Sequence, residues 1–136
     1  MFGLDDNTTA RADKFLSTFW KILKSSLNYK GEEILIVSDY GYQENILASM
    51  LAYGYYSAAF KKGMRVNILF QEVKKGFMRA DEHVIKAIEK LKKGSIIVLC
   101  LSNKLGRFSE RNSFRTFCRE RNHRFLSATG LGNVAH

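Results

Sequence analysis

The sequence predicts an α/β fold, a three-layer α/β/α sandwich on a mainly parallel four-stranded sheet, Rossmann-like or flavodoxin-like. Two observations predict it. Four short apolar runs alternate along the chain with four segments whose apolar residues recur at helical spacing. A helix between two successive strands makes those strands parallel and places helices on both faces of the sheet. The length of 136 residues corresponds to one domain.

The first half of the chain is predicted to hold two helices and two strands. Steps of one, three and four between apolar residues predict a helix over 9–28. Residues 33–38 predict a strand covered on both faces, as in a parallel sheet. A helix over 43–62 follows, with Gly63 as its left-handed terminal residue, and then a strand over 65–73. The side chains expected to be buried in these last two elements are Ile46, Leu47, Met50, Leu51, Ala58, Ala59, Val66, Ile68, Leu69 and Phe70.

The second half repeats the alternation. Asp81 is predicted to cap a helix that stops at Gly94, and residues 95–102 form the most apolar strand. Ser109 is predicted to open the next helix, and 123–127 to form a short fourth strand. The side chains expected to face inward from the last helix are Phe114, Phe117 and Cys118.

The glycine-rich tail after these elements has nothing in the predicted sheet to pack against. We therefore expect one α/β domain over residues 1–136 that is the N-terminal part of a longer protein.

Polar turns follow two of the predicted strands. In an open parallel sheet, ligands bind at the carboxyl ends of strands where the strand order reverses, and the helices that begin there favour anions. These two turns predict one crevice for a small anionic ligand. The residues expected to line it are Ser38, Asp39, Tyr40, Ser102, Asn103, Lys104 and Arg107. The alternative is structural, because Asp39 can cap a turn and Ser102 and Asn103 can simply end a strand.

A net charge of +9 favours a polyanionic partner such as nucleic acid or an acidic surface. Arginines recur every four residues from Arg107, and three of them are expected to form a basic surface on one helix: Arg111, Arg115 and Arg119. Phosphate contacts are one interpretation of this stripe. A solvated basic surface or a contact with a partner subunit is the interpretation that we favour, because no exposed aromatic residues are interleaved for base stacking.

The motifs of several enzyme classes are missing from the sequence. Neither GxGxxG nor GxxxxGK[ST] follows the first strand, no serine lies in GxSxG, and no histidine stands in HExxH. Cys100 and Cys118 lie in apolar surroundings and lack a CxxC partner, so we expect buried free thiols. We predict no catalytic and no metal-binding residue in this chain, and no cofactor of its own.

The N-terminus is acidic where a secretory signal would be basic, and no apolar run is long enough to span a bilayer. We therefore predict a cytoplasmic protein without a membrane partner.

The order of these elements resembles a known family. The segments GEEILIVSD, RVNILFQEV, ADEHVIKAIEKL, GSIIVLCLSNKLGRFSERNSFR and HRFLSATGLGNV are similar to the N-terminal domain of the aminopeptidase T family of metallo-aminopeptidases. Residues comparable to the family pattern are Ser102, Ser109, Arg111, Arg115 and, in the turn, Gly130. The proline usual near that turn is missing.

The resemblance implies a scaffold rather than an active site. In the family, divalent metal ions such as zinc, cobalt or manganese are held by a C-terminal catalytic domain, whose positions this chain does not contain. The expected partner is therefore that domain or a second subunit, and the expected function is that of a non-catalytic scaffold domain or of a stand-alone relative.

Overall fold

The computed structural model describes residues 17–41, 46–109 and 112–128. Its centre is a parallel sheet in the order β2-β1-β3-β4, in which every pairing is parallel. The strands are β1 (Ile34–Asp39), β2 (Val66–Gln71), β3 (Ile96–Cys100) and β4 (Arg124–Ala128). The predicted fold class is therefore confirmed, and the strand order is the flavodoxin-like one, with its reversal between β1 and β3.

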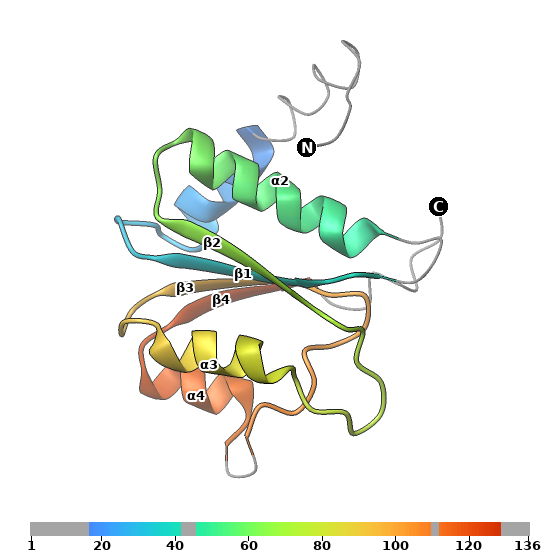
Figure 1. The fold of residues 1–136 in the computed structure, drawn as a ribbon. Helices are drawn as coiled ribbons and strands as arrows, with labels where there is room; N and C mark the ends of the chain where they lie inside the picture. Colours follow the sequence, from blue (N-terminus) through green and yellow to red (C-terminus); the bar gives the residue numbers. More distant parts are fainter. Residues whose placement is uncertain (1–16, 42–45, 110–111, 129–136) are drawn as a thin grey trace.

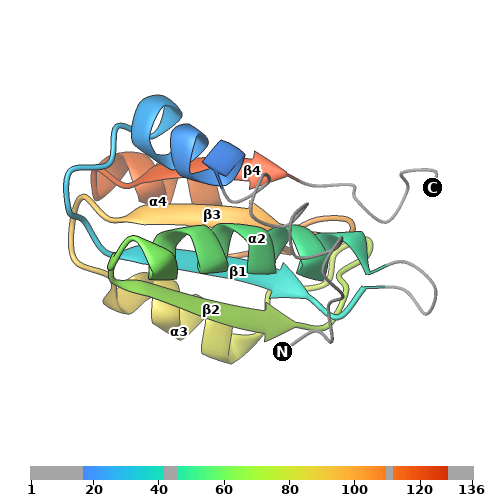
Figure 2. The same cartoon turned by 90° about the horizontal axis from the view of Figure 1, so that it is seen from above.

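Helices cover both faces of this sheet. The segments η1 (Ile22–Ser26) and α2 (Leu47–Lys61) lie on one face, and α3 (Glu82–Lys90) and α4 (Phe114–Glu120) lie on the other (Figure 1). Seen from above, all four strand arrows point the same way (Figure 2). The carboxyl ends of the strands, with their loops, are therefore gathered at one edge of the molecule.

The core has two halves separated by the central strands. Ile34, Ile36 and Val98 pack toward the α2 face, whereas Leu35 and Val37 pack toward α3 and α4. Every residue of β1 and β3 is buried. This alternation explains why both segments are apolar almost throughout, as the sequence predicted.

The first helical segment is helical over residues 17–21 and continues into η1, a π-helical turn. Leu23 and Leu27 are buried. Asn28 then takes a positive φ of 51°, which ends the helix where the sequence predicted. Residues 9–16 of the predicted helix lie outside the described part of the chain.

The buried stripe of α2 differs from the prediction. Ile46 and Met50 are 49% and 54% exposed, and Leu47 and Leu51 are only half-buried. The residues that face the sheet are Ala48, Ala52, Tyr55, Ala58 and Ala59. Small alanine side chains let the helix backbone approach the sheet closely, whereas the prediction gave the larger apolar residues priority. Gly63 has a φ of 74°, as predicted for the end of the helix.

The edge strand β2 is less buried than predicted. Val66, Ile68, Leu69 and Phe70 are half-buried because no strand covers the outer side of β2 in the described sheet. Its fully buried residue is the polar Gln71.

The helix on the other face begins as predicted after Asp81, with Val84, Ile85 and Ile88 buried. Asp81 occupies the N-cap position, yet its carboxylate makes no capping hydrogen bond and turns toward the loop that follows β2.

The last helix begins later than predicted, at Phe114 instead of Ser109. Ser113 is its N-cap and accepts a hydrogen bond from the N–H of Thr116 at 3.1 Å. Two residues before Ser109 are held elsewhere: Arg107 pairs with Arg79 in an isolated parallel bridge, and Phe108 is buried in the core. Phe117 and Cys118 are buried and Phe114 is half-buried, as the inward-facing prediction required.

Candidate functional site

The reversal of strand order places Asp39 next to Ser102. Asp39 is the last residue of β1 and Ser102 follows β3, and both are buried. The Asp39 carboxylate accepts hydrogen bonds from the Ser102 N–H at 2.8 Å, the Ser102 hydroxyl at 2.7 Å and the Gly41 N–H at 3.0 Å. At the centre of the predicted crevice, the Asp39 carboxylate is therefore bound by groups of its own chain. This contact between Asp39 and Ser102 is called the closed joint below.

The other two predicted residues of the first turn, Ser38 and Tyr40, make contacts of a different kind. Ser38 is fully buried in β1, and its hydroxyl lies 3.5 Å from the backbone oxygen of Asp39. Tyr40 is 61% exposed and stacks on Phe70, with 5.8 Å between ring centroids. The structure thus separates Ser38 and Tyr40 from the residues of the second turn.

Side chains of the second turn, after β3, form hydrogen bonds with the loop that follows β2. Asn103 donates from Nδ2 to the carbonyl of Lys74 at 2.8 Å, and Arg107 donates from Nε to the carbonyl of Phe77 at 2.8 Å. Lys104 donates from Nζ to the carbonyl of Gly76. Three of the predicted ligand-binding residues therefore bind backbone oxygens of a neighbouring loop.

The same loop contains a polar network that the sequence prediction missed. Gln71 donates to the carbonyl of Leu105 at 2.9 Å and accepts from the N–H of Asp81 at 3.1 Å. Lys74, 4% exposed, forms a short ion pair with Asp81, which also accepts from the N–H of Glu72. The hydrogen bond from Lys74 is the main cause that lowers the pKa of the Asp81 carboxyl. The signal in the sequence was Gln71 itself, a polar residue at the inner end of an apolar strand.

Gly106 is the point where the two loops touch. A Cβ at this position would lie 2.8 Å from the backbone nitrogen of Ala80 and 2.9 Å from the backbone oxygen of Met78. Its φ of 94° also favours glycine. The backbone contact continues in hydrogen bonds between Arg107 and both Met78 and Ala80.

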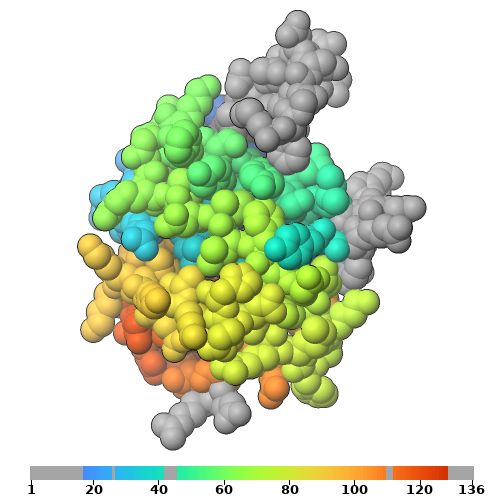
Figure 3. All heavy atoms as spheres, in the orientation of Figure 1, coloured from blue at the N-terminus to red at the C-terminus, as the bar shows by residue number. Residues whose placement is uncertain are grey.

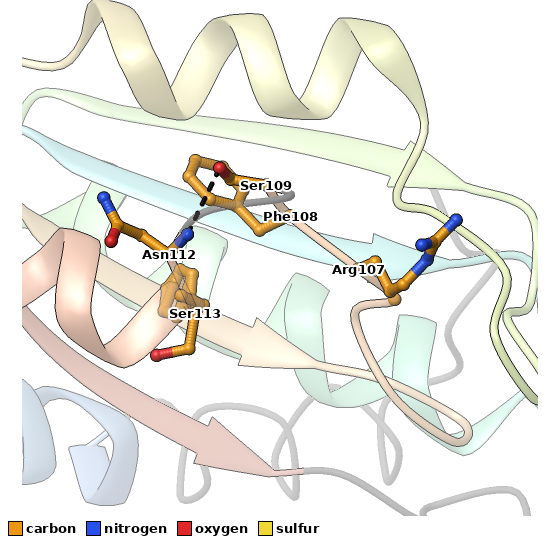
Figure 4. A pocket seen from close by; sticks show the side chains of 7 residues that line it. Arg107, Phe108, Ser109, Asn112 and Ser113 are labelled. Atoms are coloured by element: carbon orange, nitrogen blue, oxygen red, sulfur yellow. Dashed lines mark hydrogen bonds between the residues drawn. The ribbon is translucent and has the colours of Figure 1, made fainter.

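Two shallow hollows lie beside Gly106. The first, of 340 Å³, is lined by residues 106–109 and 112–114. Figure 4 shows its labelled side chains: Ser109 accepts from the N–H of Asn112, whereas Arg107 points away from them toward the loop after β2.

The second hollow, of 450 Å³, lies over the carboxyl ends of β3 and β4 and is called the cationic depression below. Its apolar side chains include Phe77, Leu99, Leu105, Phe114 and Phe125, and its basic ones are Lys104, Arg107 and Arg115. In the space-filling view, the yellow-green segment between β2 and α3 forms the lower right surface of the molecule (Figure 3). Phe77, in this segment, is 89% exposed.

The structure describes two of the three arginines of the predicted basic surface. Arg115 and Arg119 are exposed on α4, while Arg111 lies outside the described residues. The guanidinium of Arg115 lies over the ring of Phe125, 5.5 Å from its centroid. Whether this surface meets nucleic acid or a partner subunit stays a prediction.

The two cysteines are buried thiols. Cys100 and Cys118 are free and buried, as predicted, and burial raises the pKa of Cys100 to about 12 and that of Cys118 to about 11. In the described part of the chain, no three His, Cys, Asp or Glu side chains come together as metal ligands. Of the helices described, none has the length and apolar character to cross a membrane.

Comparison with known proteins shows a similarity of fold. No protein-family model matches the chain, and no curated protein matches its sequence significantly. The structure is similar to that of 2,5-dihydroxypyridine dioxygenase from Pseudomonas putida KT2440, with a TM-score of 0.59 and 11% sequence identity. The similarity covers 87% of this chain and 34% of the dioxygenase chain. At this identity it shows a shared fold, and the resemblance to aminopeptidase T stays a prediction.

Proposed function

We propose that this chain is a non-catalytic α/β scaffold domain of an aminopeptidase T-like metallopeptidase, or a stand-alone relative of such a domain. The observation that carries the proposal is the closed joint between Asp39 and Ser102. In this strand order the reversal point is the usual place for a ligand, and here a buried carboxylate fills it with three hydrogen bonds from its own chain.

The energetics of this joint support a structural role. A buried carboxylate is strongly destabilising unless hydrogen bonds replace its hydration. Hydrogen bonds to a charged group contribute about 1.5–3 kcal/mol each, so a ligand that displaced Ser102 from Asp39 would have to replace them. Gln71, Lys74 and Asp81 make a second joint of the same kind at the neighbouring strand end. Both joints hold loops in place.

A scaffold of this kind operates beside another domain or subunit. The proposed partner is the catalytic domain that the resemblance implies, and that partner would carry the zinc, cobalt or manganese ions. The dioxygenase match gives a precedent for the architecture alone, because the matched part is about a third of a longer enzyme chain.

The test is a peptidase assay of the purified chain. Leucine p-nitroanilide is incubated with the protein and Zn²⁺, Co²⁺ or Mn²⁺, and an established metallo-aminopeptidase serves as the positive control. We expect no release of p-nitroaniline above that of the metal salt alone. Metal-dependent hydrolysis that co-purifies with the chain and disappears in Asp39→Asn, a variant checked for folding by circular dichroism, would overturn the proposal.

A further inference from the structure

The cationic depression contains a group of positive charges. Of the described residues that line it, Lys104, Arg107 and Arg115 are basic and none is acidic. Within residues 17–41, 46–109 and 112–128, the ion pairs of the structure involve other cations, those of Lys74, Arg79 and Arg124. The hydrogen bonds of the Lys104 and Arg107 side chains to described residues go to neutral backbone oxygens, which do not cancel their charges.

The same depression has an apolar floor, formed by Leu99, Phe114 and Phe125 and called the aromatic floor below. Leu99 comes from β3, Phe125 from β4 and Phe114 from the start of α4. The rings of Phe114 and Phe125 meet edge to face, with 5.1 Å between centroids and an interplanar angle of 81°. Phe77 stands at the rim from the opposite loop, almost fully exposed. Apolar rings on both sides of the hollow favour a flat apolar ligand.

The three positive charges and the aromatic floor together indicate which class of ligand the depression fits. Pockets for small molecules hold about 300–1,000 Å³ and combine apolar walls with a few convergent polar groups. The depression has 450 Å³, and its three cations line the same hollow as its rings. A guanidinium can hold a carboxylate or phosphate with two parallel hydrogen bonds, and Arg115 makes no hydrogen bond with another described residue.

We propose that the cationic depression binds a small aromatic organic anion. The ring of the ligand lies against Phe114 and Phe125, and its carboxylate or phosphate is held by Arg115, Lys104 and Arg107. This site differs from the crevice that the sequence predicted. It keeps Lys104 and Arg107 from that set, leaves out the closed joint at Asp39, and adds Arg115 and the aromatic floor. It does not depend on the scaffold proposal.

The test uses the ¹⁵N-labelled full chain and a two-dimensional NMR titration with phenyl phosphate. We expect saturable shifts concentrated on the amides of the depression: Leu99, Gly106, Arg107, Phe125 and Ser127. Inorganic phosphate tests the anionic group alone, and benzyl alcohol tests the ring alone. Each is expected to bind at least about tenfold more weakly than phenyl phosphate, because each lacks one of the two contacts.

Variants assign the binding to the cations. Arg115→Gln removes an exposed guanidinium and is expected to weaken phenyl phosphate binding about tenfold, the loss of one charge-assisted contact. Lys104→Gln is a second variant with the same expected direction. The matched control is Lys93→Gln, which removes an exposed charge in the turn before β3, at the opposite end of the sheet, and is expected to leave binding unchanged.

Three outcomes would overturn the proposal. One is the absence of saturable shifts up to about 10 mM phenyl phosphate, a concentration at which even weak specific sites fill. Another is equal binding of inorganic phosphate, which would indicate a general attraction of anions to a basic protein. The third is binding that stays unchanged in both Arg115→Gln and Lys104→Gln, or shifts that map to another surface.

Discussion

The Asp39 carboxylate and the backbone N–H of Ser102 lie 2.8 Å apart, and this contact joins the ends of the two central strands. The two residues are separated by 63 positions in the sequence. Because β1 and β3 are neighbours at the reversal point, this hydrogen bond lies where a ligand would otherwise be expected. It holds the carboxyl ends of β1 and β3 together at that point.

Replacing Asp39 with alanine is expected to lower the free energy of unfolding by about 3 kcal/mol. The variant leaves the buried N–H of Ser102 without its acceptor, and an unsatisfied buried polar group costs about 1–3 kcal/mol. Ser102→Ala, which keeps that N–H bond and loses only the hydroxyl contact, is expected to cost about 1 kcal/mol. Urea denaturation followed by circular dichroism measures both. Equal stability of Asp39→Ala and the wild type would contradict the structural role.

Substitutions of Lys74 and Asp81 are expected to have strongly non-additive effects on the free energy of unfolding, because the two side chains form an ion pair. Because Lys74 is 4% exposed, removing Asp81 leaves a nearly buried ammonium group without a partner. Breaking such a pair costs about 3–5 kcal/mol. Asp81→Ala should therefore be more destabilised than the double variant that also carries Lys74→Met. Denaturation of the two single variants, the double variant and the wild type gives the coupling, and additive effects would show that the pair is not formed.

Gly106→Ala is expected to be clearly more destabilising than Gly76→Ala. Both glycines have a positive φ, which costs a residue with a Cβ about 1–2 kcal/mol. The added methyl group at position 106 also meets the backbone of Met78 and Ala80, whereas nothing lies within 4 Å at position 76. Overpacking adds about 1–3 kcal/mol. Melting temperatures of the two variants test this difference, and equal values would argue against the close contact of the loops.

The stability of the protein should fall as the pH drops below about 6.5. His123 is 6% exposed, its Nδ1 accepts from the N–H of Ser95 at 3.1 Å, and its buried Nε2 has no partner among the described residues. Burial, followed by the charge of Arg121, lowers the pKa of His123 below its unfolded value. The unfolded chain therefore takes up the proton first, and acid favours unfolding.

The variant His123→Asn can still accept the Ser95 hydrogen bond but does not titrate. Its melting temperature should therefore change less than that of the wild type between pH 7.5 and pH 5.5, values that bracket the ordinary pKa of histidine of about 6.5. Parallel pH profiles of the two proteins would exclude His123 as the source of the effect.

The fold could be predicted because its strongest signals are local. β1 and β3 are apolar on both faces, and glycines such as Gly63 mark the ends of helices. The buried face of α2 was predicted correctly at Ala59 but not at its N-terminal half, since the contact with the sheet selected Ala52 over Met50. How close a helix approaches a sheet is a tertiary property, and the periodicity of apolar residues does not contain it.

The predicted site residues lie at the expected edge of the sheet, but the partners of these residues were not predicted. Lys104 and Arg107 do lie at the carboxyl ends of the strands, as the order of elements implied. Their contacts with the backbone of the β2–α3 loop depend on the conformation of that loop, for which KKGFMRA gives no periodic signal. Arg115 joins the depression only because Phe125, ten positions later, returns in a neighbouring strand.

The central position of β1 has a consequence for how the protein forms during synthesis. β1 precedes both of its neighbours in the chain, and its pairing residues in β2 and β3 begin at Val66 and Ile96. While the ribosome adds these segments, the apolar run ILIV remains without strand partners. Parallel pairing over such separations is slow, and an unpaired apolar segment is prone to aggregation. Nascent chains of this protein should therefore depend on chaperones until β3 has emerged.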